Sequence, residues 1–379
     1  MVHCSTKLLK TVFQVHTMNR RSNMFDSPNF YPKSNFGTGI QTNANGFVHH
    51  RLHTIKDACH VEYITGVYRL TAVNIKIARN NEPFVLLRLS DNTGDIDAIL
   101  WPERKAHNWQ PPYANSVNEC FYVTGKVEYF KPRKGFANLY LPSNPLVRGT
   151  IVIDDIRRAT QDDIKNTKTL ATLPRIWCPN KAIFEKLIKT AENIESDSLQ
   201  RFVCRVLEQP VVAKKFLTAP ASTKYHHSYP GGLLEHSIEV ACIVNNIELY
   251  RSATEKELAT VGALFHDLGK IRSYDDNGYM SLNGRLTNHS AQTLEICAES
   301  LAVLEQEEYR YAEALRHIWT CATPGARYGQ PAKFAIAHAV QAADRLSAEF
   351  GNENVAFSNA NSCAQKSARI GQLEYLRVI

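Results

Sequence analysis

The chain has 379 residues, of which 44% are hydrophobic and 21% charged, and its formal net charge at pH 7 is +7. These values are typical of a globular protein with two or three domains, and they exclude a disordered or fibrous chain. No apolar run approaches the roughly 18–20 residues of a membrane-spanning helix. The N-terminus also lacks an apolar core with a cleavage site, so we expect no membrane contact and no secretion signal.

The basic character lies in the first 150 residues. Residues 1–61 hold seven Lys or Arg against two Asp or Glu, and residues 62–150 hold eleven against eight, whereas residues 151–379 hold 26 against 27. This asymmetry indicates a nucleic-acid-binding part beside a separate catalytic body, although an excess this small in residues 62–150 also fits ordinary surface charge. The nine cysteines are scattered without a CxxC pair, which indicates free thiols in the reducing cytoplasm.

The first 150 residues contain two regions with different sequence patterns. Residues 1–58 are rich in Asn, Ser, Thr and His without a sustained period, so we predict a disordered or loosely attached segment. Beyond it, alternating apolar residues and intervening turns predict strands at 67–77, 84–89, 95–101, 120–130 and 136–141. Five strands in about eighty residues, with a helix-sized gap after the third, predict an OB-fold barrel over residues 62–150.

OB barrels hold single strands with aromatic and basic side chains around their second and third strands and the neighbouring loops. Phe84 and Trp101 are aromatic candidates, although their strand positions favour the barrel core. The basic candidates are Arg88, Lys131, Arg133 and Lys134. The last three also fit a solvated hairpin tip, and an OB fold by itself does not assign a function.

The remainder of the chain predicts an all-α body. Residues 151–180 contain several prolines and charged residues and are typical of a connector. Helical periodicity begins near residue 181 and continues to about residue 350, and residues 351–379 form a polar C-terminal tail. The predicted fold is therefore multidomain, with an N-terminal all-β OB-fold barrel and a C-terminal all-α domain.

The helical part contains an adjacent His266-Asp267 pair within an apolar run. Burial of an unpaired polar group costs roughly 2–7 kcal/mol, and a divalent metal removes that cost because imidazole and carboxylate are good ligands. A lone His-Asp pair is usually a buried histidine beside a surface carboxylate. Here His236 opens an apolar helix after a Pro-Gly-Gly break, and Asp344 lies in a third apolar helix. This arrangement predicts a metal site.

The order His, His-Asp, Asp on three helices resembles the HD superfamily of metal-dependent phosphohydrolases, and the resemblance extends to Gly269 and Lys270. It implies a divalent ion, Mn²⁺ first and Mg²⁺, Co²⁺ or Fe²⁺ as alternatives, bound by His236, His266, Asp267 and Asp344. His266, Asp267 and Lys270 would be the catalytic residues. Lys270 would bind the scissile phosphate or stabilise the leaving group, and it equally fits a solvated lysine at a helix end.

The chain is also similar to the YhaM-type 3′→5′ exoribonucleases, which place an OB domain before an HD domain and carry the motifs HH-x-Y-x-G-G-L-L-E-H and G-R-L-x-x-H. This resemblance implies that His289 is an extra metal ligand, although a helix-capping or core histidine is an alternative. It implies that His226 and His227 contact substrate phosphate. Where the family has a second His-His pair, this chain reads Thr-Cys-Ala-Thr-Pro-Gly at 320–325. We therefore expect one tightly held ion unless His317 or Cys321 compensates.

Three functions remain open from the sequence. The first is a metal-dependent 3′→5′ exonuclease that holds single-stranded RNA or DNA on the OB domain and cuts it at the HD site. The second is an HD phosphohydrolase of small nucleotides. The third is a non-catalytic nucleic-acid-binding protein with a relict metal site, against which the complete ligand set argues. The sequence does not distinguish RNA from DNA, identify the metal or give the oligomeric state.

Overall fold

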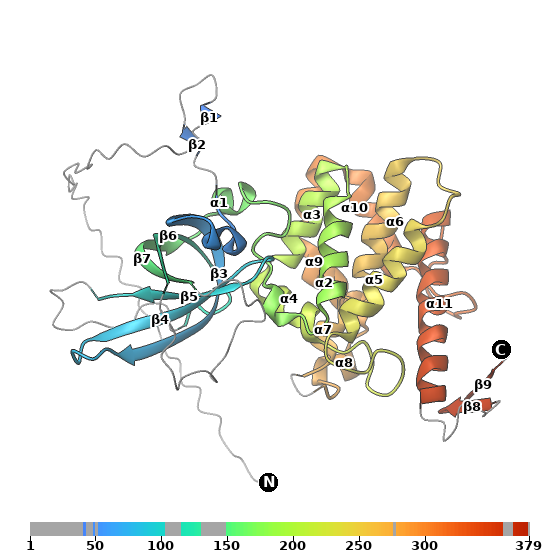
Figure 1. Ribbon diagram of the computed structural model, residues 1–379. Coiled ribbons are helices and arrows are strands. Elements are labelled where there is room, and N and C mark those ends of the chain that lie inside the picture. Colours follow the sequence, from blue (N-terminus) through green and yellow to red (C-terminus); the bar gives the residue numbers. More distant parts are fainter. Residues whose placement is uncertain are drawn as a thin grey trace, which may run out of the picture. The chain divides into compact units, whose positions relative to one another are not determined.

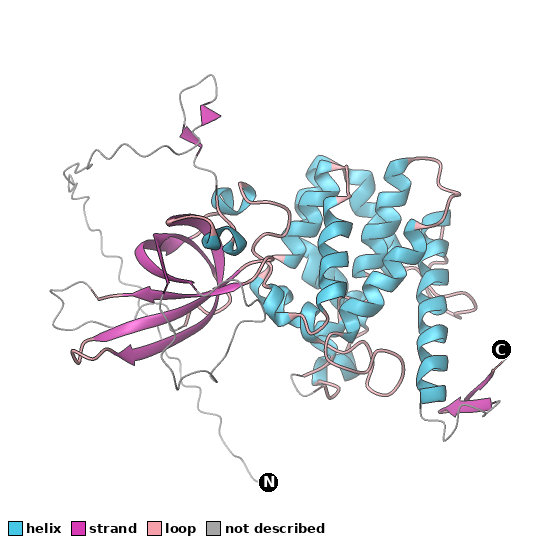
Figure 2. Cartoon of the chain, viewed as in Figure 1, coloured by secondary structure: helices cyan, strands magenta, loops and turns pink. Residues whose placement is uncertain are grey.

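The computed structural model describes residues 41–42, 48–49, 52–102, 115–129, 149–275, 278–358 and 367–377 (Figure 1). The chain divides into two units, Met1–His49 and His50–Ile379. In the first unit, β1 (Gln41–Thr42) pairs antiparallel with β2 (Val48–His49). The second unit holds a β-barrel and a helical body, whose strands and helices are distinguished by colour in Figure 2.

The barrel closes in the order β3-β4-β5-β7-β6. Its strands are β3 (Tyr63–Ile77), β4 (Pro83–Ser90), β5 (Asp95–Leu100), β6 (Cys120–Tyr129) and β7 (Gly149–Arg158). All neighbours are antiparallel except β5 and β7, which pair in parallel. Alternate residues of β4 fill the interior, with Val85, Leu87 and Leu89 fully buried. This closed five-stranded topology is that of the predicted OB fold.

The first four predicted strands are confirmed as β3 to β6. The predicted strand at 136–141 lies outside the described residues. The fifth barrel strand is β7, which crosses the predicted domain limit at residue 150 and occupies the start of the stretch predicted as a connector, 151–180. Its outer half carries Asp154, Asp155, Arg157 and Arg158, so the apolar alternation that identifies a strand fades there. The barrel therefore continues to Arg158.

One end of the barrel is covered by a 3₁₀ helix, η1 (Ile55–Cys59), in which Ile55 and Ala58 belong to the barrel core. The predicted loosely attached segment, residues 1–58, includes most of η1, because a five-residue 3₁₀ helix is too short to show a period. Asp91 connects η1 to the β4–β5 turn through hydrogen bonds. Its carboxylate accepts hydrogen bonds from the backbone N–H groups of Ile55 at 2.7 Å, Thr93 at 2.7 Å and Gly94 at 2.9 Å. Burial raises the pKa of Asp91 to about 6.

The helical body follows the barrel and has its own apolar core. Its helices are α1 (Gln161–Lys165), η2 (Arg175–Trp177), α2 (Lys181–Glu192), α3 (Asp197–Leu207), α4 (Pro210–Thr218), α5 (Gly232–Asn245), α6 (Ala253–Phe265), α7 (Lys270–Ser273), α8 (Leu282–Leu286), α9 (His289–Glu307), α10 (Tyr309–Thr320) and α11 (Ala335–Ser358). The predicted tail, 351–379, instead begins with the last two turns of α11 and contains a hairpin of β8 (Ser367–Ile370) and β9 (Leu373–Leu376). Within the described ranges, every helix is too short or too polar to cross a membrane.

Arg69 connects β3 to the helical body. Its fully buried guanidinium donates to the carbonyl oxygens of Thr172 at 3.0 Å, Asn118 at 2.6 Å and Glu208 at 2.8 Å. Glu208 is the C-terminal capping residue of α3. A buried charge is tolerated only when it is hydrogen-bonded, and of these three bonds the one to Glu208 fixes the barrel strand to the end of α3 and the one to Thr172 fixes it to the segment before α2.

Candidate active site

Three helices supply the predicted metal ligands. His236 lies on α5, the His266-Asp267 pair follows the end of α6, and Asp344 lies on α11. Helix α5 packs against both α6 and α11, which brings the three sequence-distant segments together. His236 is fully buried and Asp267 almost so, whereas Asp344 is half-exposed. The cluster is therefore open to solvent on the side of Asp344.

The four side chains converge on one point. The Nε2 atom of His236 lies 3.2 Å from Nε2 of His266, 3.1 Å from Oδ1 of Asp344 and 3.5 Å from Oδ2 of Asp267. The Nε2 atom of His266 lies 3.5 Å from each of the same carboxylate oxygens. Donors that share one ion at about 2.1 Å lie roughly 3.0–3.4 Å apart. The four residues therefore fit a single divalent ion.

The electrostatics of this cluster also favour a cation. Burial lowers the pKa of His266, but Asp267 and Asp344 raise it to about 9. Burial would raise the pKa of Asp267, yet Lys270 and the surrounding histidines hold it well below its usual range. The pKa of Asp344 is also lowered, against burial, by its hydrogen bonds to His236 and His266. Two ionised carboxylates whose oxygens lie within 4.8 Å of each other favour positive charge between them, and a divalent ion supplies it.

Hydrogen bonds on the far side of each imidazole fix its tautomer. The Ser347 hydroxyl donates to Oε2 of Glu239 at 2.8 Å, so it accepts from Nδ1–H of His236 at 3.1 Å. Nδ1–H of His266 donates to the carbonyl oxygen of Ala263 at 2.7 Å. Both rings therefore direct an Nε2 atom toward the cluster, as metal-ligating histidines do. The sequence alone does not indicate that Ser347 or Glu239 supports the metal ligands.

We predict that Ser347→Ala weakens metal binding while the fold persists. Without the hydroxyl, His236 is no longer held in the tautomer that presents the Nε2 lone pair, and loss of such an orienting group lowers metal affinity by about 10–100-fold. Competition with a chelator measures the affinity. The matched control is Ser237→Ala, because the neighbouring Ser237 hydroxyl is buried without a hydrogen-bond partner. Equal affinities in the two variants would show that Ser347 does not orient the ligand.

The glycine after the His-Asp pair allows α9 to approach. A Cβ atom on Gly269 would overlap the carbonyl oxygen of His289, and the Gly269 N–H donates to Oγ1 of Thr293 at 2.8 Å. This contact places His289 Nε2 3.3 Å from Oδ1 of Asp267, the oxygen that faces away from the four-donor cluster. The Lys270 ammonium donates to Oδ2 of Asp267 at 2.5 Å. His289 and Lys270 thus both contact Asp267, and neither belongs to the four-donor set.

The two adjacent histidines before α5 have different surroundings. His227 is buried, adopts a positive φ of 52° and has Nε2 3.3 Å from Oε1 of Glu239. His226 is only partly buried, and its ring centroid lies 5.3 Å from that of His236. Of the two predicted substrate contacts, His226 is therefore the more accessible, whereas His227 supports the Glu239 carboxylate that bonds Ser347.

A small cavity opens beside this centre. It has a volume of about 380 Å³, and its lining includes Lys270, Arg285, Asn288 and His289. Arg285 and His289 belong to the motif Gly-Arg-Leu-x-x-His singled out in the sequence. A cationic cavity of this size suits one phosphate-bearing nucleotide.

His317 and Cys321 do not compensate for the missing histidine pair. The His317 Nε2 atom accepts from the backbone N–H of Lys333 at 3.0 Å, and the Cys321 sulfur accepts from Gln341 at 3.2 Å. In the part of the chain that the structure describes, neither belongs to a metal-binding group.

We therefore predict one tightly bound ion per chain. A second ion bound to Asp267 would have only His289 as a further ligand among the described residues, and one histidine does not provide the three or four protein ligands of a stable site. Two other groups of possible ligands exist among these residues, but the group of His226, His227 and His236 shares His236 with the first ion, and in the group of His227, Glu235 and Glu239 the first and last residues already pair with each other. Elemental analysis after dialysis against metal-free buffer should give one equivalent. His289→Ala should leave this value unchanged, and two retained equivalents would contradict the prediction.

The barrel carries an exposed aromatic pair. The rings of Phe84 and Trp101 lie 5.1 Å apart; Trp101 is 44% exposed and Phe84 is partly buried, and neither is among the residues of the barrel core, which their strand positions favoured. Lys76, which the sequence did not single out, pairs with Phe84 across β3 and β4 and is exposed. Arg88 is bound to Asp95 at 2.8 Å and Asp97 at 2.7 Å. The candidates Lys131, Arg133 and Lys134 lie outside the described residues.

Known proteins share these features. The HD domain family matches residues 233–349, which include all four donors, and a helicase family, TraI_2, matches residues 178–273. The 3′-5′ exoribonuclease YhaM of Shouchella clausii is 30% identical over 280 residues, covering 69% of this chain and 76% of that protein. The YhaM proteins of Bacillus licheniformis and Bacillus subtilis are 22% and 24% identical, each covering 60% of this chain and 69% of its own length.

Among solved structures, an aspartyl tRNA synthetase from Entamoeba histolytica aligns at 10% identity over 70% of this chain and 57% of that chain, with a TM-score of 0.22, which is too low to bear on the fold. The 30% identity to the Shouchella clausii protein extends over more than two thirds of both chains. The chain therefore belongs to the YhaM family of 3′-5′ exoribonucleases, whose HD centre it carries behind an OB-fold barrel.

Proposed function

We propose that this protein is a metal-dependent 3′→5′ exonuclease that shortens single-stranded RNA from its 3′ end. The four convergent donors on α5, α6 and α11 are the observation that carries the proposal. They belong to a chain whose relatives are named 3′-5′ exoribonucleases. The free cysteines of the described residues agree with a cytoplasmic protein.

His236, His266, Asp267 and Asp344 would hold the ion, for which we propose Mn²⁺ because a mixed set of imidazole and carboxylate donors suits it. Such an ion supplies hydroxide near neutral pH and offsets charge on the phosphoryl group. The half-exposed side of the cluster, at Asp344, leaves room for substrate.

The substrate phosphates would be held by the cationic residues around the 380 Å³ cavity. Lys270, already directed at Asp267, lies between the ion site and this cavity, and Arg285 lies on its wall. Both can bind phosphate oxygens by charge-assisted hydrogen bonds. His226 would contact the same strand from the α5 side of the cluster, because it is the accessible member of its pair.

The barrel would hold the part of the strand that has not yet reached the centre. The Phe84–Trp101 pair, in which Trp101 is exposed and Phe84 partly buried, would offer stacking surface for bases, and Lys76 lies beside it to bind the backbone. Lys131, Arg133 and Lys134 would add phosphate contacts.

The test uses RNA and DNA of one sequence, each labelled at the 5′ end, with Mn²⁺, Mg²⁺ or EDTA. We expect a ladder of RNA products that keep the label and shorten with time, and no products in EDTA. A substrate blocked at the 3′ end should persist, whereas a block at the 5′ end should have no effect. Shortening from the 5′ end, or products in EDTA, would contradict the proposal.

The single four-donor cluster also fits a phosphohydrolase of small nucleotides. A panel of mononucleotides and cyclic nucleotides, assayed beside the labelled strands, separates the two functions. Rapid hydrolysis of a nucleotide together with intact RNA would establish this second function in place of the first.

A further inference from the structure

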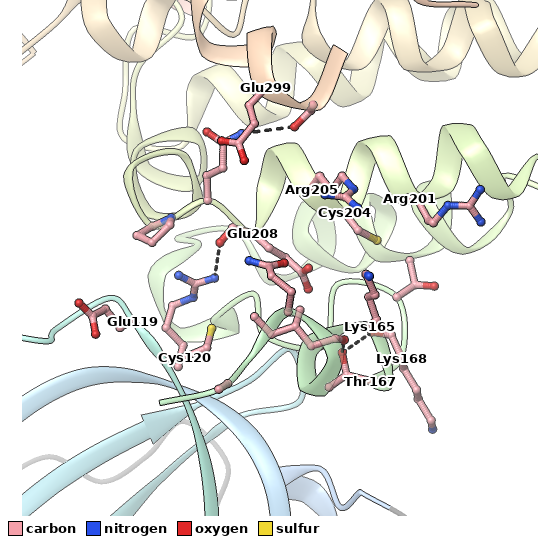
Figure 3. Close-up of a pocket in the computed structure, with 18 of the residues that line it drawn as sticks. Glu119, Cys120, Lys165, Thr167, Lys168, Arg201, Cys204, Arg205, Glu208 and Glu299 are labelled. Atoms are coloured by element: carbon pink, nitrogen blue, oxygen red, sulfur yellow. Dashed lines mark hydrogen bonds between the residues drawn. The ribbon is translucent and has the colours of Figure 1, made fainter. Parts of the chain in front are cut away.

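A second, larger cavity of about 720 Å³ lies where the barrel meets the helical body. Its wall combines the start of β6 and the end of β7 with residues of α1, α3 and α9. Figure 3 shows Glu119 and Cys120 on the barrel side, and Lys165 and Lys168 across from the labelled side chains of α3. Binding sites for small molecules usually measure about 300–1,000 Å³, so this space suits a molecule of nucleotide size.

The wall of this cavity is positively charged. Six Lys or Arg side chains line it against three carboxylates, those of Glu119, Glu208 and Glu299. Glu119 is already paired with Arg158 at 3.1 Å. Burial raises the pKa of Glu208 to about 7, so its negative charge is incomplete at neutral pH. A concave, low-dielectric wall with excess positive charge concentrates anions.

Two of the cations have no ion-pair partner among the residues that the structure describes. The described residues place no carboxylate within ion-pair distance of Arg205 or Lys168, whereas Arg158, Arg201 and Lys165 of the same wall each have one. Arg205 is half-buried in the last turn of α3. A partly desolvated guanidinium without a carboxylate is best satisfied by a ligand oxygen, and its planar fork matches a phosphate group.

This cavity is separate from both parts of the proposed nuclease. On β3, Arg69 of the cavity lies seven residues from Lys76, the neighbour of Phe84, which is about 23 Å along a strand. On α9, Glu299 of the cavity lies ten residues from His289, which is about 15 Å along a helix. An occupant of the cavity would therefore contact neither the ion site nor the aromatic pair.

The chemistry of the wall limits the ligand. The residues that line the cavity, all within the described ranges, include no aromatic ring on which a base could stack. Recognition must therefore depend on charge. We propose that this cavity binds a small molecule with adjacent phosphate groups, held by Arg205 and Lys168. Free pyrophosphate and a nucleoside diphosphate share this chemistry.

Calorimetric titration of the full chain tests the proposal, with pyrophosphate, ADP and citrate as probes. EDTA is present throughout, so that phosphate binding through an ion at the HD centre does not contribute. We expect pyrophosphate and ADP to bind and citrate to bind more weakly, because carboxylates do not reproduce the adjacent phosphates. A tighter ADP complex would identify a nucleotide as the occupant, and equal affinities would identify the phosphates alone.

The variant is Arg205→Gln with Lys168→Ser, which should bind pyrophosphate at least about tenfold more weakly, as loss of a charge-assisted hydrogen bond predicts. The matched control is Lys186→Ser with Lys214→Ser, which removes the same charge from exposed positions on α2 and α4. Melting temperature and metal content verify that each variant is folded. If the double variant does not fold, Lys168→Ser alone provides the test, because Lys168 is exposed.

Three results would overturn the proposal. The first is the absence of pyrophosphate binding by the wild-type protein at millimolar concentration. The second is an equal loss of affinity in the Arg205/Lys168 variant and the Lys186/Lys214 control, which would indicate a general charge effect. The third is citrate affinity equal to that of pyrophosphate, which would contradict phosphate recognition.

Discussion

His266→Ala will abolish metal binding and hydrolysis together. His266 provides one of four donors, and its Nε2 atom lies 3.2 Å from Nε2 of His236 and 3.5 Å from an oxygen of Asp267 and of Asp344. Residues that merely orient a ligand already contribute about 10–100-fold to metal affinity, so removal of a ligand should cost more than 100-fold. Asp267→Asn should have the same effect, because the amide removes the negative charge that Lys270 and three histidines surround. Elemental analysis and the RNA assay measure the two losses.

The control for His266→Ala is His338→Ala, since His338 is exposed on α11 and, within the described residues, makes no hydrogen bond or ion pair with the four donors. It should retain wild-type metal content and activity. Helical content and melting temperature show whether the His266 variant is folded. Full activity of His266→Ala after chelation would remove the metal centre from the proposed reaction.

Phe84→Ser with Trp101→Ser will separate strand binding from chemistry. Each stacked base contributes roughly 1–3 kcal/mol, so affinity for a long single strand should fall by about tenfold or more. Hydrolysis of a dinucleotide should be unchanged, because the pair lies on β4 and just beyond β5, whereas the metal ligands lie on the helices. Binding to labelled RNA of graded lengths measures this loss of affinity. The difference between the variant and the wild-type protein should disappear at the shortest length.

Tyr63→Ser is the control, because Tyr63 is also an exposed aromatic residue and lies at the opposite end of β3 from Lys76, the neighbour of Phe84. Replacement of Lys131, Arg133 and Lys134 should have a different signature. It should flatten the salt dependence of binding, through fewer released counterions, whereas loss of the aromatic pair should leave that slope intact. Unchanged long-strand affinity in both variants would show that the barrel does not hold the strand, and would favour the small-nucleotide function.

Periodicity and residue type were sufficient to predict the two-part architecture. The alternation in residues 67–100 predicted the first three barrel strands, because period two reports which side chains enter a core. A metal site could be expected from polar ionisable residues in apolar helices, the full ligand set rested on the resemblance to the HD superfamily, and the structure brings its four side chains together. Strand β7 was not predicted, because the charged residues of its outer half interrupt the apolar alternation. Helix η1 was not predicted, because its five residues are too few to show a period.

The sequence by itself determined which residues could bind an ion, and the tertiary structure decided what surrounds them. The contact between His236 and Ser347 joins residues 111 positions apart, and no local pattern encodes such a pairing. The same holds for Arg69, whose bond to Glu208 spans 139 positions and helps form the wall of the larger cavity. Local patterns report burial and helical or strand period. Hydrogen-bond partners depend on how distant segments pack, so only the folded chain reveals which histidine tautomer is fixed and which cations remain unpaired.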